Sequence, residues 1–260
     1  MYWISQLENA PGRTGPPGEC GVVEWAREKL GFDADPTQAR VLVSRSRRGL
    51  LNCTRQWGKS TVTAAKAVHL AVTCAESLIL VVSPSARQSG ELLRKAEGFA
   101  RKLGIRPKGD GDNEISLAFP NGSRMVGLPG NEDTVRGFSA VNLLLVDEAS
   151  RVSDELYMAV RPMLAVSRGT IWAMSTPFGK RGFFYEAWAN EKEEWDRVRV
   201  TAEACPRISQ KFLVEEQRAM GDRCYRQEYL CEFGDSVSSV FDRDDIERAI
   251  TDDIRPLKFG

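Results

Sequence analysis

Three short, almost entirely apolar segments constrain the fold of this chain more than any other feature. They cover residues 77–82 (SLILVV), 141–146 (VNLLLV) and 170–174 (TIWAM). A continuous apolar run of this length is typical of a parallel strand whose two faces are both buried. Segments with helical periodicity lie between them, at 60–75, 86–103 and 153–164. The alternation predicts an α/β fold with a mostly parallel central sheet flanked by helices.

The rest of the chain divides into recognisable stretches. We expect a helix at 21–30, strands at 41–44 and 50–53, and a hairpin of 115–119 with 124–127 around a Pro-Asn-Gly turn. After about residue 206 the pattern changes to two charged amphipathic helices, 212–220 and 223–230, followed by an acidic stretch at 235–255. The predicted units are an N-terminal arm and helix (1–35), a core (36–205), and a helical annex or lid with a linker (206–260).

Composition excludes several classes of protein. The 36 basic and 36 acidic residues balance, so only local patches could attract nucleic acid. No apolar run reaches the 18 or so residues that a membrane span needs. The N-terminus lacks a signal-peptide pattern, so we expect a cytoplasmic protein. Six cysteines without a CxxC pair indicate reduced core thiols. The single histidine, His69, leaves the chemistry to carboxylates, lysine and arginine.

Residues 50–61 (LLNCTRQWGKST) follow a predicted strand and begin a predicted helix, which is the setting of a phosphate-binding loop. Gly58 permits a tight turn that directs backbone amides at anionic oxygens. Lys59 would reach the β- and γ-phosphates, and Ser60 would offer its hydroxyl to Mg²⁺. The first glycine of the pattern GxxxxGKS/T is replaced by Cys53, so the segment alone could also be a helix start with an incidental lysine.

A second motif, residues 143–149 (LLLVDEA), places two carboxylates at the end of an apolar strand. Ligands of open α/β sheets bind beyond the carboxyl ends of the strands, where the phosphate loop would also lie. Asp147 suits the shell of Mg²⁺, and Glu148 suits a base that orients an attacking water. The alternative is a pair of capping acids before the next helix. Together the two motifs predict a site for ATP and Mg²⁺.

Two arginines and one strand end complete the constellation. Arg55 lies within the loop, where it could touch the γ-phosphate of its own subunit. Arg136 precedes a glycine and suits a finger that enters a neighbouring subunit's site. Either could instead be a surface ion-pair residue. Hydroxyls of the segment Ser175, Thr176 and Pro177 could sense the nucleotide, or the segment could simply end its strand.

This combination resembles the ATPase domain of tailed-phage terminase large subunits over residues 36–180 or so. The resemblance implies a P-loop NTPase of the RecA-like, additional-strand catalytic-glutamate type. It implies that Glu148 is the catalytic base, Arg55 a cis sensor, Arg136 a trans finger, and Ser175, Thr176 and Pro177 a coupling motif. The metal would be held by Ser60 and Asp147. The implied ATP-binding residues are Thr54, Arg55, Gln56, Trp57, Gly58, Lys59, Ser60, Thr61 and, at the adenine, Gln38.

Such a domain is a motor that hydrolyses ATP to translocate double-stranded DNA into a procapsid in the host cytoplasm. The resemblance implies the portal, the procapsid and a small terminase subunit as partners, a homo-oligomeric ring when assembled, and a monomer alone. Full large subunits also carry a nuclease domain; the sequence ends where that domain would start, so we expect no DNA cleavage from this chain.

Two basic patches are candidates for contact with DNA phosphates, and each could equally be a solvated surface. One contains Arg45, Arg47 and Arg48, and the other contains Arg94, Lys95, Arg101, Lys102, Arg106 and Lys108. Two other functions stay open. A helicase-like translocase would carry a second similar lobe, and a non-catalytic nucleotide-gated DNA-binding module would not need Glu148.

Overall fold

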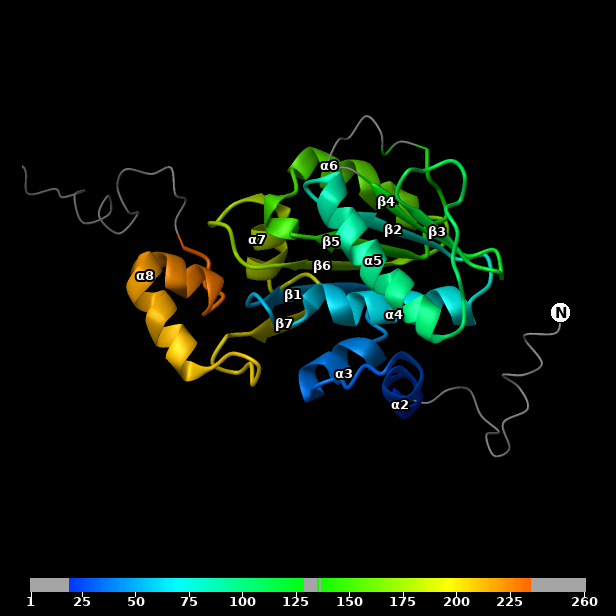
Figure 1. The fold of residues 1–260 in the computed structure, drawn as a ribbon. Coiled ribbons are helices and arrows are strands. Elements are labelled where there is room, and N and C mark those ends of the chain that lie inside the picture. Colours follow the sequence, from blue (N-terminus) through cyan, green and yellow to red (C-terminus); the bar gives the residue numbers. More distant parts are fainter. Residues whose placement is uncertain (1–18, 129–134, 136, 235–260) are drawn as a thin grey trace, which may run out of the picture.

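The computed structural model describes residues 19–128, 135 and 137–234 (Figure 1). Its helices are α2 (Glu19–Leu30), α3 (Pro36–Val43), α4 (Lys59–Thr73), α5 (Ala86–Lys102), α6 (Asp154–Val160), α7 (Gly182–Ala189) and α8 (Gln210–Glu228), with two short 3-10 helices, η2 (Ala149–Arg151) and η3 (Arg161–Leu164). Its strands are β1 (Arg48–Cys53), β2 (Leu78–Val82), β3 (Ser116–Ala118), β4 (Arg124–Leu128), β5 (Leu143–Asp147), β6 (Thr170–Ser175) and β7 (Asp196–Val200).

The strands form one seven-stranded sheet in the order β3-β4-β2-β5-β6-β1-β7. All neighbours are parallel except β3, which pairs antiparallel with β4. The three apolar segments of the sequence form the adjacent strands β2, β5 and β6, which are buried along almost their whole length. The predicted fold class is confirmed, and the hairpin forms the edge of the sheet.

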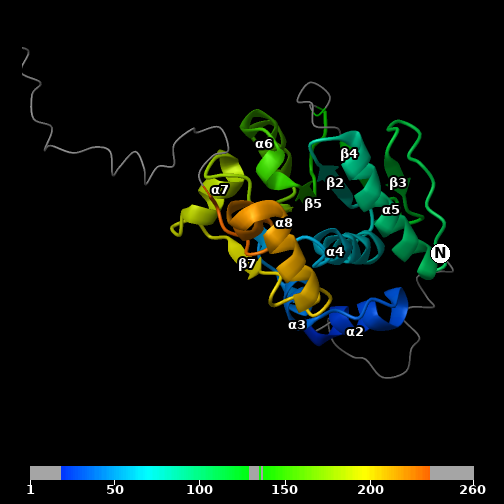
Figure 2. The same ribbon diagram turned by 60° about the vertical axis from the view of Figure 1, so that its left-hand side comes forward.

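Helices cover both faces of the sheet (Figures 1 and 2). Helices α2, α3, α4 and α5 pack on one face, in a core that contains Trp57, Val68 and Trp172. Helices α6 and α7 pack on the other face, around Leu144 and Phe184. Each strand therefore contributes alternate side chains to two cores, which explains why its sequence is apolar without interruption.

Residues 41–44 are not the strand that we predicted. The carboxylate of Asp35 accepts a hydrogen bond from the backbone amide of Gln38, and the backbone amide of Asp35 donates to the side-chain oxygen of Gln38. Pro36 occupies the first helical turn. This capping box begins a helix that continues through Val43. At its end, the ammonium of Lys66 donates to the carbonyls of residues 41, 42 and 44. Local capping thus overrides the β-branched pattern.

Two elements after residue 180 were not predicted, the helix α7 and the strand β7. β7 pairs parallel with β1 and closes the sheet at the edge opposite to the hairpin. Its sequence, DRVRV, alternates charged and apolar residues because only one face is well buried. The helix predicted at 153–164 ends as α6 at Val160 and continues as the 3-10 turn η3 around Pro162.

The predicted pair of annex helices corresponds to α8, which is interrupted at Gly221 with φ 78°. Its residues Leu213 and Tyr225 form a small separate core with Ala202 and Tyr229. In Figure 1 α8 lies at the left, away from the hairpin at the right. The predicted N-terminal arm and the acidic stretch at 235–255 lie outside the described residues.

Among the described residues, no helix is long and apolar enough to cross a bilayer. The prediction of core thiols holds for Cys53, Cys205 and Cys231, which are buried. It is wrong for Cys74 and Cys224, which are exposed because they lie at the end of α4 and on the outer surface of α8.

Candidate nucleotide-binding site

The loop after β1 and the acid pair after β5 meet at the carboxyl edge of the sheet. Lys59 is the first residue of α4, and Asp147 is the last residue of β5. The hydroxyl of Ser60 lies 3.5 Å from Oδ2 of Asp147. Strands β5, β6 and β1 are neighbours in the sheet, so their ends deliver these side chains to one place. The two halves of the predicted site are therefore together.

The loop itself is held in a tight conformation. Gln56 and Gly58 both have positive φ values, of 63° and 100°, and only glycine adopts such a value without strain. Trp57 between them buries its indole in the core, at 1% exposure. Its side chain therefore anchors the loop at the wall of the cavity described below.

Gln38 braces this loop from α3. Its Nε2 donates to the carbonyl of Trp57 at 2.9 Å, and its Oε1 accepts from the amide of Asp35 at 3.1 Å. Both amide atoms are thus engaged in a side chain that is only 2% exposed. Arg207, from the segment before α8, also donates to the carbonyl of Trp57. The geometry places Gln38 as a support of the loop, beside the cavity in which adenine was expected.

Lys59 is buried and points back across the loop. Its ammonium donates to the carbonyls of Cys53 and Thr54, at 2.7 and 3.1 Å. The hydroxyl of Thr54 turns away and donates to the carbonyl of Glu228 in α8. The loop without its early glycine therefore keeps its lysine on backbone oxygens, which are acceptors that phosphate oxygens could replace.

The two carboxylates occupy different environments. Asp147 is 8% exposed, and burial, followed by the negative charge of Glu148, raises its pKa from 3.8 to about 6. The positive charges of Lys59 and Lys95 act in the opposite direction. Glu148 lies in the left-handed region, at φ 50°. A non-glycine residue in this conformation is held there by its surroundings.

The segment at the end of β6 is tied to the acid pair. The hydroxyl of Ser150, two residues after Glu148, lies 2.6 Å from Oγ of Ser175 and donates to the carbonyl of Thr176 at 2.8 Å. Ser175 and Thr176 are themselves buried. The predicted coupling motif, which ends at Pro177, is therefore linked by hydrogen bonds to the turn that positions Glu148.

Of the two predicted arginines, Arg55 forms an ion pair with the C-terminal annex. Arg55 extends from the loop to Glu228, with 2.7 Å between Nε and Oε2. This hydrogen bond raises the pKa of Arg55, and the charge of Glu148 acts in the same direction. The nucleotide loop is thus linked to the C-terminal annex by an ion pair. Arg136, the predicted trans finger, lies outside the described residues.

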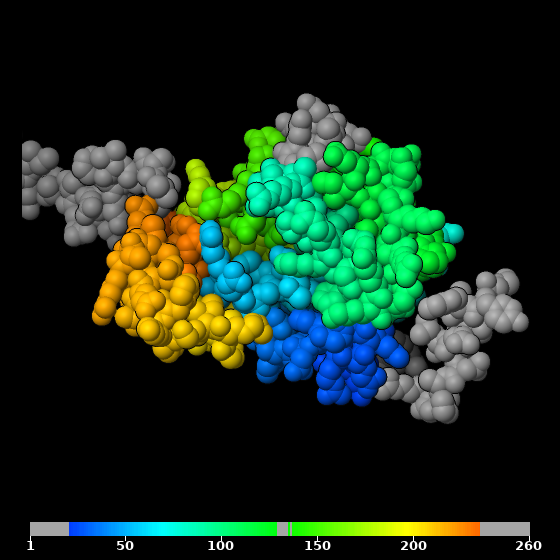
Figure 3. All heavy atoms as spheres, viewed as in Figure 1, coloured from blue at the N-terminus to red at the C-terminus, as the bar shows by residue number. Residues whose placement is uncertain are grey.

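A cavity of about 640 Å³ opens beside the loop. Figure 3 shows the loop and α4 in light blue at the surface between α8, in orange, and the cyan-green segment of α5. Of the predicted residues, those that line the cavity are Gln38, Arg55, Gln56, Trp57, Gly58, Lys59, Ser60, Thr61 and Glu148. Five more were not predicted: Phe32, Gln88, Lys95, Arg151 and Arg207.

The oxygen donors at this site fit Mg²⁺. A serine hydroxyl and a carboxylate face each other, and Asp147 is a buried acid that receives one backbone hydrogen bond, from the amide of Glu148. Mg²⁺ is commonly held by one or two protein oxygens together with phosphate and water.

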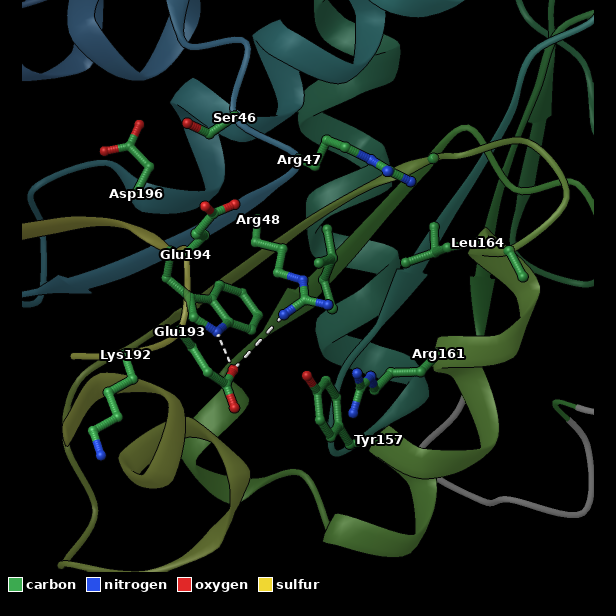
Figure 4. Close-up of a pocket in the computed structure, with 14 residues that line it drawn as sticks. Ser46, Arg47, Arg48, Tyr157, Arg161, Leu164, Lys192, Glu193, Glu194 and Asp196 are labelled. Atoms are coloured by element: carbon green, nitrogen blue, oxygen red, sulfur yellow. Dashed lines mark hydrogen bonds and ion pairs between the residues drawn. The ribbon is translucent and has the colours of Figure 1, made fainter. Parts of the chain in front are cut away.

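A larger cavity, of about 1000 Å³, lies at the opposite edge of the sheet, where β1, β6 and β7 begin (Figure 4). Arg48 lies 3.8 Å from the carboxylate of Glu193, and Arg161 lies over the ring of Tyr157 at 5.5 Å. The first basic patch of the sequence, with Arg47 and Arg48, is therefore separated from the acid pair by the length of the strands.

The mostly parallel sheet, the lysine loop between β1 and α4, and the acid pair at the end of β5, which β6 separates from β1, define a P-loop NTPase. Within this class, a family model described as "Terminase large subunit, T4likevirus-type, N-terminal" matches residues 50–248. The match covers most of the chain, which therefore belongs to the terminase large subunit family.

Individual relatives agree with this assignment. The chain is 29% identical over 133 residues to a "Probable terminase, large subunit" of Enterobacteria phage P7, a match that covers 46% of this chain and 27% of that protein. The matched region thus spans about a quarter of the length of this curated relative.

Two solved structures show the same fold. The large terminase ATPase domain of Thermus phage P74-26 has a TM-score of 0.68 and 21% identity, and the match covers 80% of this chain and 96% of that one. A large terminase of a thermophilic bacteriophage in complex with ADP has a TM-score of 0.62 and 16% identity, and the match covers 83% of this chain and 52% of that one.

Proposed function

We propose that this chain binds ATP with Mg²⁺ and hydrolyses the ATP to ADP and phosphate. The observation that carries the proposal is that Lys59, Ser60 and Glu148 line one cavity and that Asp147 lies 3.5 Å from the hydroxyl of Ser60. An ADP complex and an ATP-γ-S complex exist among the structurally similar large terminases. These complexes support the choice of nucleotide.

In the proposed reaction the loop binds the phosphates of ATP, and the acid pair holds Mg²⁺ and activates the attacking water. Lys59 exchanges the carbonyls of Cys53 and Thr54 for phosphate oxygens, and the amides around Gly58 face the same anion. Ser60 and Asp147 would hold Mg²⁺, which supplies charge compensation for the phosphates when it is bound. Glu148 orients a water and accepts its proton as the water oxygen attacks the γ-phosphorus. The bond to the bridging oxygen breaks, and that oxygen leaves with ADP.

The arginines would complete the charge compensation. Arg55 would act in its own subunit, after exchanging Glu228 for the γ-phosphate. We further propose that Arg136 acts on the site of a neighbouring subunit in a homo-oligomeric ring. Release of Glu228 would change the link between the loop and α8, and the hydroxyl network of Ser150 and Ser175 would transmit the state of the acid pair to β6.

Membership of the terminase family supports translocation of double-stranded DNA as the work coupled to hydrolysis. We propose the portal of a procapsid and a small terminase subunit as partners, in the host cytoplasm. Contact with DNA would be to phosphates and therefore sensitive to salt. The basic residues at 101–108 remain candidates for that contact.

The substitution Glu148→Gln tests the proposal. Turnover should fall by roughly 10²–10⁴-fold, because the amide cannot accept the proton, while the affinity for a fluorescent ATP analogue should stay within twofold or so. Glu155→Gln, an exposed change on α6, is the matched control. Phosphate release is measured with and without DNA. Hydrolysis that survives Glu148→Gln contradicts the assignment of the base, and a wild-type chain that binds ATP without hydrolysing it favours a non-catalytic module.

A further inference from the structure

The five cations of α5 do not have equivalent surroundings. Arg94 and Arg101 each pair with a glutamate one turn earlier on the same helix, at 2.6 Å, and Lys102 donates to a backbone carbonyl at 2.7 Å. Arg87, at the start of the helix, lies outside the nucleotide cavity. Lys95 is exposed, and among the described residues it has no hydrogen-bond or ion-pair partner. The ammonium of Lys95 is therefore available.

Lys95 points to the nucleotide cavity. It lines this cavity with Lys59, Ser60 and Glu148, whereas its neighbour Arg94 does not. Gln88, seven residues earlier and thus on the same face of α5, lines the cavity as well. The sequence placed Lys95 in a patch for DNA, but the structure places it inside the cavity wall.

The nearness of Lys95 to the acid pair favours the outermost phosphate as its partner. The loop amides and Lys59 would serve the phosphates at the start of α4, and Phe32 and Arg207 also line the cavity. The acid pair lies at the end of β5, where Glu148 would orient water toward the γ-phosphate. Lys95 lines the cavity together with Glu148, and its charge acts on Asp147. A lysine presents a compact charge on a long flexible stem, so it suits a phosphate that changes position and is then released.

We propose that Lys95 contacts the γ-phosphate of ATP within the same chain and makes the site favour ATP over ADP. This inference rests on the proposed function, since it requires that the cavity binds ATP. Because α5 also carries the paired arginines of the second basic patch, this contact would connect the presence of the γ-phosphate to the helix that borders that patch. Lys95 and Arg94, a member of that patch, are consecutive residues of this helix and therefore lie on adjacent faces of it.

The test compares Lys95→Met with Lys211→Met, an exposed lysine in the first turn of α8 that does not line the cavity. Affinities for ADP and for a non-hydrolysable ATP analogue are measured by displacement of fluorescent ADP in the presence of Mg²⁺. For Lys95→Met we expect the affinity for the ATP analogue to fall by roughly 10–100-fold, as for a lost hydrogen bond to a charged group. The affinity for ADP should change less than about twofold, and Lys95→Arg should recover part of the loss.

Each outcome decides between clear alternatives. Equal losses for ADP and the ATP analogue would indicate a structural role and overturn the inference. Unchanged nucleotide affinities with weakened DNA binding would return Lys95 to the basic patch and overturn it too. A wild-type chain that binds neither nucleotide would refute the proposed function itself, whereas tight wild-type binding with an unaffected Lys95→Met variant refutes only the inference.

Discussion

Replacing Asp147 by asparagine is expected to stabilise the nucleotide-free protein at neutral pH. The carboxyl group is buried, and burial together with the charge of Glu148 raises its pKa from 3.8 to about 6. Between these pH values the folded protein keeps a proton that the unfolded chain has released. Stability therefore falls as the pH rises through this interval. The ionised side chain of Asp147 therefore lowers the free energy of unfolding of the nucleotide-free protein.

The size of this cost follows from the same values. The interval from 3.8 to about 6, at about 1.4 kcal/mol per pKa unit, corresponds to about 3 kcal/mol at pH 7. Asparagine has the same shape and no charge at any pH. We expect Asp147→Asn to be more stable than the wild type by up to about 3 kcal/mol at pH 7, and the difference to vanish near pH 4.

Urea unfolding in EDTA at several pH values from 4 to 8 measures this difference. Asp112→Asn, an exposed change in the loop before β3, is the control and should show no such dependence on pH. Adding Mg²⁺ with ATP should stabilise the wild type and reverse the order, because binding to the folded state adds stability. If Asp147→Asn is no more stable than the wild type at pH 7 in EDTA, the buried carboxylate is not the unfavourable charge described here.

Two further substitutions test the supports of the site. Gln38→Ala removes the brace on the carbonyl of Trp57, so affinities for ATP and GTP should fall together and stability should fall by about 1–3 kcal/mol; a loss confined to ATP would show that Gln38 instead recognises adenine. Gly49→Ala would place a Cβ 2.3 Å from the ring of the buried Trp172, so thermal unfolding should show a loss of stability of about 1–3 kcal/mol. Gly98→Ala on α5 is the control: its Cβ would meet open space, so the change should be neutral or slightly stabilising. Equal melting temperatures for the two alanine variants would contradict the packing argument.

The part of the site that could be predicted is the part encoded by consecutive residues. Lys59 and Ser60 follow a strand, Asp147 and Glu148 end a strand, and parallel strands bring such ends to one edge. No comparable rule applies to Lys95. That residue reaches the cavity through the packing of α5 on α4, which its own sequence does not specify.

The same distinction explains the errors in the fold. Residues 41–43 (VLV) are as suitable for a strand as for a helix, and the signal that decided the outcome was the cap at Asp35 and Pro36. Strand β7 was not predicted because it has only five residues, three of them charged, so its alternation of charged and apolar residues is too short to stand out. Arg207 lines the cavity only because the annex returns to the loop, a long-range contact that periodicity cannot reveal.

The place of β1 in the sheet has a consequence for biosynthesis. β1 ends at residue 53, yet its two neighbours are β6, which ends at residue 175, and β7, which ends at residue 200. A ribosome adding about 5–20 residues per second needs on the order of ten seconds to produce the last of them. Both edges of β1 lack their native partners until β6 has been made, and one edge lacks its partner until β7 has been made. The segment that would bind phosphate is made early but reaches its native place in the sheet late, so the nascent chain has to avoid aggregation until β7 emerges.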